Sequence, residues 1–118
     1  MAFKYYTQLA ELEISKAKSE AERQIIHACR ESVVVGNDYP CLESLTGAND
    51  RENGYALLRQ CLELMKERGM NVFASYTYKI ADCGLNRVLT DMGCEKTANC
   101  QLYDSFNDRH FGWLWRMV

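Results

Sequence analysis

The stretch that decides the fold reads TGANDRENGYALL and spans residues 46–58. It is a short polar loop that opens a helical pattern, and the free N–H groups and dipole of a helix N-terminus attract phosphate. Gly54 lets the backbone approach an anion closely, and the small Ala56 leaves room beside the first turn. Arg51 can add charge-assisted hydrogen bonds. The stretch therefore predicts a phosphate or diphosphate site, although a glycine before a helix is more often only a turn.

The segments before this loop predict helices followed by two strands. Residues 5–31 contain no Gly or Pro and are rich in good helix formers. Ser19 followed by Glu22 is a capping-box pattern, so we expect two helices, or one helix that bends near Ser19. The valines of residues 32–35 predict a short strand. A second strand is expected over Cys41 to Thr46, because Pro40 before it cannot donate to a sheet.

The segments after the loop predict two helices and three strands. A helix is expected over residues 55–68, with its apolar face at Leu57, Cys61, Leu64 and Met65. Residues 71–79 are apolar enough for a central strand, and Asp82 can cap a further helix. Two last strands, residues 95–103 and 109–117, are joined by a polar turn. The order of elements predicts one domain of mixed α/β class.

The loop also carries a resemblance to a known family. Arg51-x-x-Gly54-x-Ala56 resembles the R/Q-x-x-G-x-G/A signature of the GNAT superfamily of N-acetyltransferases, which holds the diphosphate of acetyl-CoA. The flanking segments are similar as well, over about residues 41–97. The resemblance implies a single GNAT-like domain, α/β (mixed α+β), with a central mixed sheet flanked by helices. Residues 1–31 would form its helical N-terminal part, residues 41–97 its acetyl-CoA-binding core, and residues 98–118 its C-terminal strands.

The resemblance further implies where the cofactor binds. In the family, the strand before the signature splays away from the next strand and pairs with the pantetheine arm of acetyl-CoA. The backbone of Leu45 and Thr46 would play that part here. The residues expected to bind acetyl-CoA are Leu45, Thr46, Arg51, Glu52, Asn53, Gly54, Tyr55, Ala56 and Asp82.

Acetylation of an amine needs a base for the amine and an acid for the leaving thiolate. Glu43 aligns with a strand position from which some family members supply the base, and otherwise it is a solvent-facing carboxylate. The tyrosine that often serves as the acid in the family is replaced by Leu89. The candidate acids are then Tyr76, Tyr78 and Tyr103, of which Tyr103 is the expected catalytic residue, unless all three are packed aromatics.

The predicted function is transfer of acetyl from acetyl-CoA to an amine of a small molecule or a protein. Leu89 and the short N-terminal part also fit a catalytically inactive GNAT-like protein that acts by protein contact. Compact proteins of that kind occur among phages, as virion-associated proteins or as inhibitors of host defence. A third interpretation is an unrelated small α/β interaction module whose loop happens to fit the signature.

Composition argues against several other classes. The net charge of −2 disfavours binding to a nucleic-acid backbone, and no apolar run approaches the roughly 20 residues of a membrane span. No metal site is expected, because His27 and His110 lie far apart without clustered acids. The six cysteines form no C-x-x-C pair and are expected to be reduced thiols, which predicts the cytoplasm of the producing or host cell, or a virion. The aromatic alternation of residues 111–117 predicts a core face or the interface of a homodimer or larger assembly.

Overall fold

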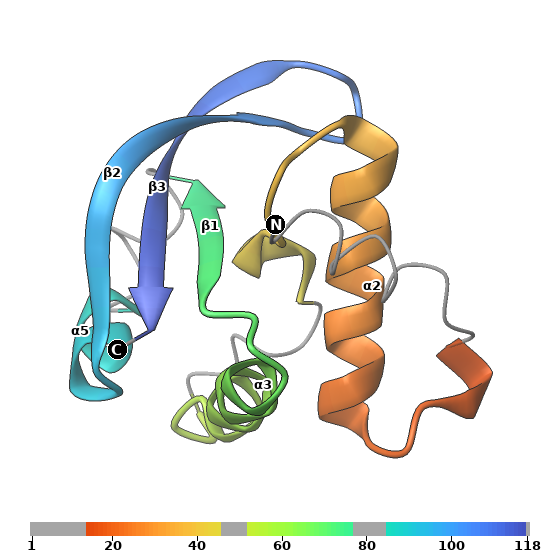
Figure 1. Cartoon of the computed structure of the whole chain (residues 1–118), viewed down its shortest axis with the longest axis vertical. Coiled ribbons are helices and arrows are strands. Elements are labelled where there is room, and N and C mark those ends of the chain that lie inside the picture. The colour runs from red at the N-terminus through yellow and green to blue at the C-terminus, as the bar shows by residue number, and fades with distance from the viewer. Residues whose placement is uncertain (1–13, 46–51, 77–84, 118) are drawn as a thin grey trace.

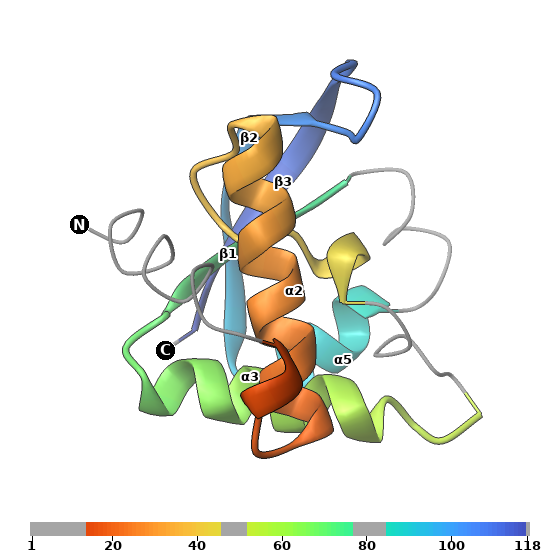
Figure 2. The same cartoon turned by 90° about the vertical axis from the view of Figure 1, so that its right-hand side faces the viewer.

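The computed structural model describes residues 14–45, 52–76 and 85–117 (Figure 1). With η for a 3-10 helix, its elements in chain order are η1 (Ile14–Lys16), α2 (Glu20–Val35), η2 (Leu42–Ser44), α3 (Ala56–Glu67), β1 (Val72–Tyr76), α5 (Leu85–Asp91), β2 (Cys94–Tyr103) and β3 (Arg109–Met117). Helix α2 stands beside the sheet, and α3 lies across the lower end of α2 (Figures 1 and 2). The described residues form one domain of mixed α+β class, as the order of elements predicts.

Helix α2 begins where the sequence predicts and ends later than predicted. The Ser19 side chain accepts a hydrogen bond from the Glu22 amide at 3.1 Å, so the cap near Ser19 is confirmed. The strand predicted for residues 32–35 is wrong, because these residues continue α2 until Gly36 ends it with a left-handed φ of 83°. Valine costs a helix only about 0.7 kcal/mol per residue or less relative to alanine, so tertiary context overrides its preference for strands.

The strand predicted for Cys41 to Thr46 is also wrong over its described part. Only Cys41 pairs with the sheet, through a parallel bridge to Ala74, whose amide donates to the Pro40 carbonyl at 2.9 Å. The chain then turns into η2, which buries both Leu42 and Leu45 in the core. A 3-10 turn places residues three apart on one side, so it buries both leucines where a strand would point them to opposite faces.

In the described part of the chain the sheet has three strands in the order β1-β3-β2, and all of their pairings are antiparallel. The last two predicted strands are confirmed within one residue at each end. The predicted central position of the strand after Asn71 is wrong, because β3 is central and the other side of β1 takes the bridge from Cys41. Within the described residues the sheet is therefore antiparallel rather than mixed, apart from that one parallel bridge.

The core joins the helices to one face of the sheet. The buried face of α3 is Leu58, Cys61, Leu62 and Met65, so the predicted face is displaced by about one position, with Leu57 and Leu64 only half-buried. Trp115 is buried, its ring stacks on Phe73 at 6.3 Å between centroids, and its indole N–H donates to the Ser75 hydroxyl at 3.0 Å. The aromatic alternation of β3 therefore serves the core at its C-terminal end.

The five described cysteines are free thiols, and burial raises the pKa of Cys29 and of Cys61 to about 12. These thiols are small apolar core residues rather than nucleophiles. In the described part of the chain, no helix has the length and apolar character needed to cross a membrane.

Candidate functional site

One cavity gathers residues from four distant segments of the chain. It has a volume of about 340 Å³ and lies between the C-terminal end of α2, η2, the end of β1 and the turn that follows β2. Three carboxylates line it, from Glu31, Glu43 and Asp104, and so do the side chains of Tyr76 and Phe106. Of the described residues, no Lys, Arg or His lines it. The arrangement therefore suits a ligand group that carries positive charge.

Glu43 stands on the cavity wall where the chain leaves the sheet. One carboxylate oxygen accepts the Tyr76 amide at 3.1 Å, and the other accepts the Cys41 thiol at 2.9 Å. The Tyr76 amide thus bonds to the Glu43 side chain instead of to the backbone carbonyl that a neighbouring strand would have supplied. Burial raises the pKa of Cys41, and the adjacent Glu43 carboxylate raises it further, so Cys41 stays a neutral thiol that positions Glu43.

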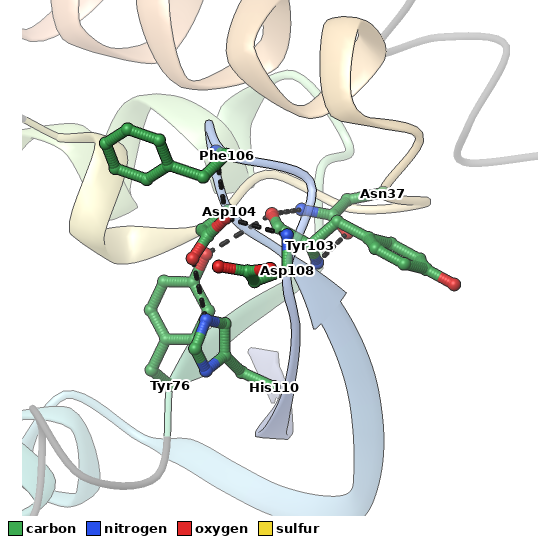
Figure 3. Close-up of polar contacts among 7 residues, drawn as sticks. All are labelled: Asn37, Tyr76, Tyr103, Asp104, Phe106, Asp108 and His110. Carbon is green, nitrogen blue, oxygen red and sulfur yellow. Dashed lines mark hydrogen bonds and ion pairs between the residues drawn. The ribbon is translucent and has the colours of Figure 1, made fainter.

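Two of the three tyrosines predicted as candidate acids, Tyr76 and Tyr103, lie at the site but are oriented differently. The Tyr76 hydroxyl points toward the end of β2 and donates to the Tyr103 carbonyl at 3.3 Å (Figure 3). The ring of Tyr103 points away from Tyr76, Asp104 and His110, so Tyr103 joins this group of residues through its backbone (Figure 3). Tyr78, the third candidate, lies outside the described residues.

Asn37 ties the end of α2 to the end of β2. Its amide nitrogen donates to the Tyr103 carbonyl at 3.0 Å, and its amide oxygen accepts the Tyr103 N–H at 2.9 Å (Figure 3). The side chain of Asn37 is buried and pairs with Tyr103 as a neighbouring strand would. The sequence marks residues 36–38 only as a turn, and nothing in it indicates a partner 66 positions away.

Asp104 organises the turn between β2 and β3. Its carboxylate accepts the amides of Phe106 and Asp108, each at 2.9 Å, and pairs with the Nε2 atom of His110 at 2.7 Å (Figure 3). These hydrogen bonds, with the one from His110 as the largest contribution, hold the pKa of Asp104 below its ordinary value. Asp104 is therefore ionised at neutral pH and lies on the cavity wall as a carboxylate.

None of the described residues that are expected to bind acetyl-CoA lines this cavity. Thr46, Arg51 and Asp82 lie outside the described residues. Leu45 is buried, and its amide already donates to the Leu42 carbonyl at 3.0 Å, which leaves that N–H unavailable to a pantetheine arm.

The described part of the signature is an exposed turn that leads into α3. Glu52, Asn53, Gly54 and Ala56 are exposed, and the Ala56 amide donates to the Asn53 carbonyl at 3.3 Å. Gly54 and Tyr55 both have left-handed backbones, with φ of 62° and 59°. Tyr55 is buried in the core, and that burial offsets a left-handed conformation that costs a bulky residue about 1 kcal/mol or more. A Cβ atom placed on Gly54 would meet no atom of residues 14–45, 52–76 or 85–117 within 4 Å, so these residues leave the space above the turn open.

A second cavity, of about 240 Å³, lies between α3, the start of β2 and the end of β3. Arg59 and Lys66 line it with Glu63, over an apolar floor that includes Met92 and Met117. Arg59 also donates from its Nε atom to the Gly54 carbonyl at 3.3 Å, which places a cation beside the exposed turn. Within the described ranges, no three His, Cys, Asp or Glu side chains are grouped so that they could hold a metal ion.

Comparison with known proteins adds no relative to this description. No family model, no curated protein and no solved structure matches the chain.

Proposed function

We propose that the chain is a GNAT-like N-acetyltransferase, in which an amine enters the acidic cavity and acetyl-CoA binds along the exposed turn that opens α3. The observation that carries the proposal is the cavity itself. Glu43 and Tyr76, selected from the sequence as a base and a candidate acid, line the same wall although they are 33 positions apart.

The path of the chain around Glu43 supports the proposal. After the single bridge between Cys41 and Ala74, the chain turns into η2 instead of continuing beside β1. The resemblance leads us to expect that two neighbouring segments diverge at the place where the acetyl group would enter. The divergence of these two segments is of that kind. The turn that carries Gly54 and the helix α3 follow η2 along the chain, in the order that the signature requires.

The chemistry assigned to the cavity is proton transfer around an amine. An ammonium group is attracted by the carboxylates of Glu31, Glu43 and Asp104, and Glu43 takes up its proton. Acetyl-CoA would supply the thioester that the neutral amine attacks, and CoA would leave as a thiolate when the C–S bond breaks. Tyr76 rather than Tyr103 is the tyrosine suited to return a proton to the thiolate, because the Tyr103 ring points away (Figure 3).

Of the residues that would hold acetyl-CoA, the structure describes Leu45 and residues 52–56. The exposed turn, the open space over Gly54 and the nearby Arg59 suit a diphosphate. Acetyl-CoA would supply the acyl group. The amide of Leu45 is excluded from the set that would bind the pantetheine arm.

Thermal melting with and without acetyl-CoA tests the proposal. At about 100 times the dissociation constant, binding should stabilise the protein by roughly 2.7 kcal/mol. The Gly54→Glu variant should lose this shift, because a carboxylate would face the diphosphate. The matched control is Gly54→Asn, since asparagine accepts the left-handed conformation without added charge and should keep much of the shift.

Release of free CoA thiol with a panel of amines then tests transfer. Glu43→Gln keeps the shape of the side chain and should lower the rate by about 100-fold or more without altering the acetyl-CoA shift. An acetyl-CoA shift that Gly54→Glu leaves unchanged removes the assigned site, and full transfer by Glu43→Gln removes Glu43 as the base.

One observation favours the catalytically inactive alternative. Leu89, where the family often has its tyrosine acid, is fully buried in the core and offers no hydroxyl. A protein that binds acetyl-CoA in the melting experiment but releases no thiol with any amine of the panel would support that alternative.

A further inference from the structure

The exposed large apolar side chains of the described residues gather at one end of the molecule. Val33 and Val34 lie at the C-terminal end of α2 and are 37% and 81% exposed. Phe106, in the turn between β2 and β3, is 84% exposed, and Phe111 in β3 is 70% exposed. The end of α2 and this turn lie at the top of both Figure 1 and Figure 2. Exposed apolar side chains that gather at one place mark a contact surface more often than scattered ones do.

The same end of the molecule holds the acidic cavity. Val35 and Phe106 line the cavity together with the carboxylates of Glu31, Glu43 and Asp104. Phe106 is therefore both exposed and part of the cavity wall, and the exposed Val34 directly precedes the cavity-lining Val35 in α2. A ligand that enters the cavity and extends beyond its rim lies against Phe106.

Phe106 is held in an ordered turn despite its exposure. Its amide donates to the Asp104 carboxylate at 2.9 Å, and the same oxygen accepts the Asp108 amide (Figure 3). The Asp104 amide in turn donates to the Asp108 carbonyl at 3.0 Å, which closes the turn. A side chain presented by a fixed backbone loses less entropy on binding, and aromatic anchors of this kind dominate many interfaces.

We propose that this end of the molecule docks another polypeptide, which inserts a lysine side chain into the cavity while its apolar neighbours cover Phe106 and Val34. A small cation would fill the cavity and leave these two apolar side chains in water. The lysine stem would pass the apolar Val35 and Phe106, and its ammonium group would reach the carboxylates. Docking does not depend on acetyl-CoA; only the statement that this lysine is the acetyl acceptor rests on the proposed function.

An immobilised peptide array tests the docking without acetyl-CoA. Its probes are seven-residue peptides with blocked ends, a central lysine and apolar flanking residues, each paired with the same peptide carrying norleucine at the centre. The protein should retain a subset of lysine peptides at least about tenfold better than their norleucine partners. Phe106→Ser and Glu31→Gln should each weaken that retention about tenfold, whereas Glu67→Gln on the exposed side of α3 should not.

Three results overturn the docking proposal. The first is that no lysine peptide is retained over its norleucine partner. The second is that Phe106→Ser binds the array as wild type does, which would remove the apolar surface from the contact. The third is that 1,4-diaminobutane binds more tightly than the best peptide, which would assign the cavity to a small molecule. Loss of the acetyl-CoA shift with peptide binding intact would count against the proposed acetyl transfer alone.

Discussion

The cavity wall and the turn that opens α3 are built in different ways, although the sequence marks both as functional. On the cavity wall, Tyr76 and Asn37 bond to Tyr103 from 27 and 66 positions away, in addition to the short-range bonds of Asp104. At the turn, the bonds of Ala56 and Arg59 reach three to five positions, and the buried Tyr55 joins the turn to the core. The cavity wall therefore depends on bonds between distant segments, whereas these bonds of the turn form between near neighbours.

Substitution of Asn37, on the cavity wall, is expected to lower the stability of the protein most. Asn37→Leu buries an apolar side chain where Asn37 lies, leaves the Tyr103 N–H without its partner and leaves the Tyr103 carbonyl with only the Tyr76 hydroxyl, which should lower the free energy of unfolding by about 3 kcal/mol. Urea denaturation followed by circular dichroism measures the change. The exposed neighbour provides the control, since Asp38→Ala should change the free energy by less than about 0.5 kcal/mol. A loss below about 1 kcal/mol in Asn37→Leu would mean that water replaces the amide easily and that the cavity wall is not a fixed structure.

Two glycines, one in the sheet and one in the turn, are expected to differ in how much stability is lost when alanine replaces them. A Cβ atom on Gly112 in β3 would lie 2.5 Å from the Leu102 Cδ1 atom and 2.8 Å from the Ser75 carbonyl oxygen, so Gly112→Ala should destabilise the fold by about 2 kcal/mol. At Gly54→Ala the new Cβ meets no atom of the described residues within 4 Å, and the expected cost is that of the left-handed backbone, about 1 kcal/mol. The same urea experiment measures both variants. Equal losses, or a larger loss at Gly54, would contradict the distinction between the packed sheet, in which Gly112 is the strand partner of Tyr76, and the exposed turn.

The smallest expected effect is that of low pH on the stability that the Asp104 carboxylate gives to the turn that carries Phe106. The folded protein holds the pKa of Asp104 below its unfolded value, so the folded state binds fewer protons at this group as the solution becomes acidic. The resulting stabilisation is fully present above the unfolded pKa of about 4 and is lost as the pH falls through the lower folded pKa.

Asp104→Asn should therefore flatten the fall in stability below about pH 4, which urea titrations at a series of pH values measure. The matched control is Asp108→Asn, because in Asp108 only the backbone takes part in the turn. If the stability of Asp104→Asn depends on pH as that of wild type does, the Asp104 carboxylate is not the group that stabilises the turn.

Local patterns in the sequence were sufficient for most of the elements. The Ser19 cap, the helix α3 and the hairpin of β2 and β3 follow from capping, apolar period and turn residues, which act between near neighbours. The pattern was misleading at residues 32–35 and at residues 42–44. There the preference of the residues for a strand was weaker than the gain from continuing α2 and from burying Leu42 with Leu45.

The candidate site likewise has features that follow from the sequence and features that follow only from the fold. The sequence by itself selected Glu43 and the turn around Gly54 through their resemblance to a known family, and Tyr76 as one of the phenols that could act as the acid. Only the tertiary structure decided that Glu43 and Tyr76 share a wall with Glu31 and Asp104, and that Tyr103 turns its ring away (Figure 3). Contacts such as the one between Asn37 and Tyr103 leave no local pattern, since they form only when packing brings segments 66 positions apart together.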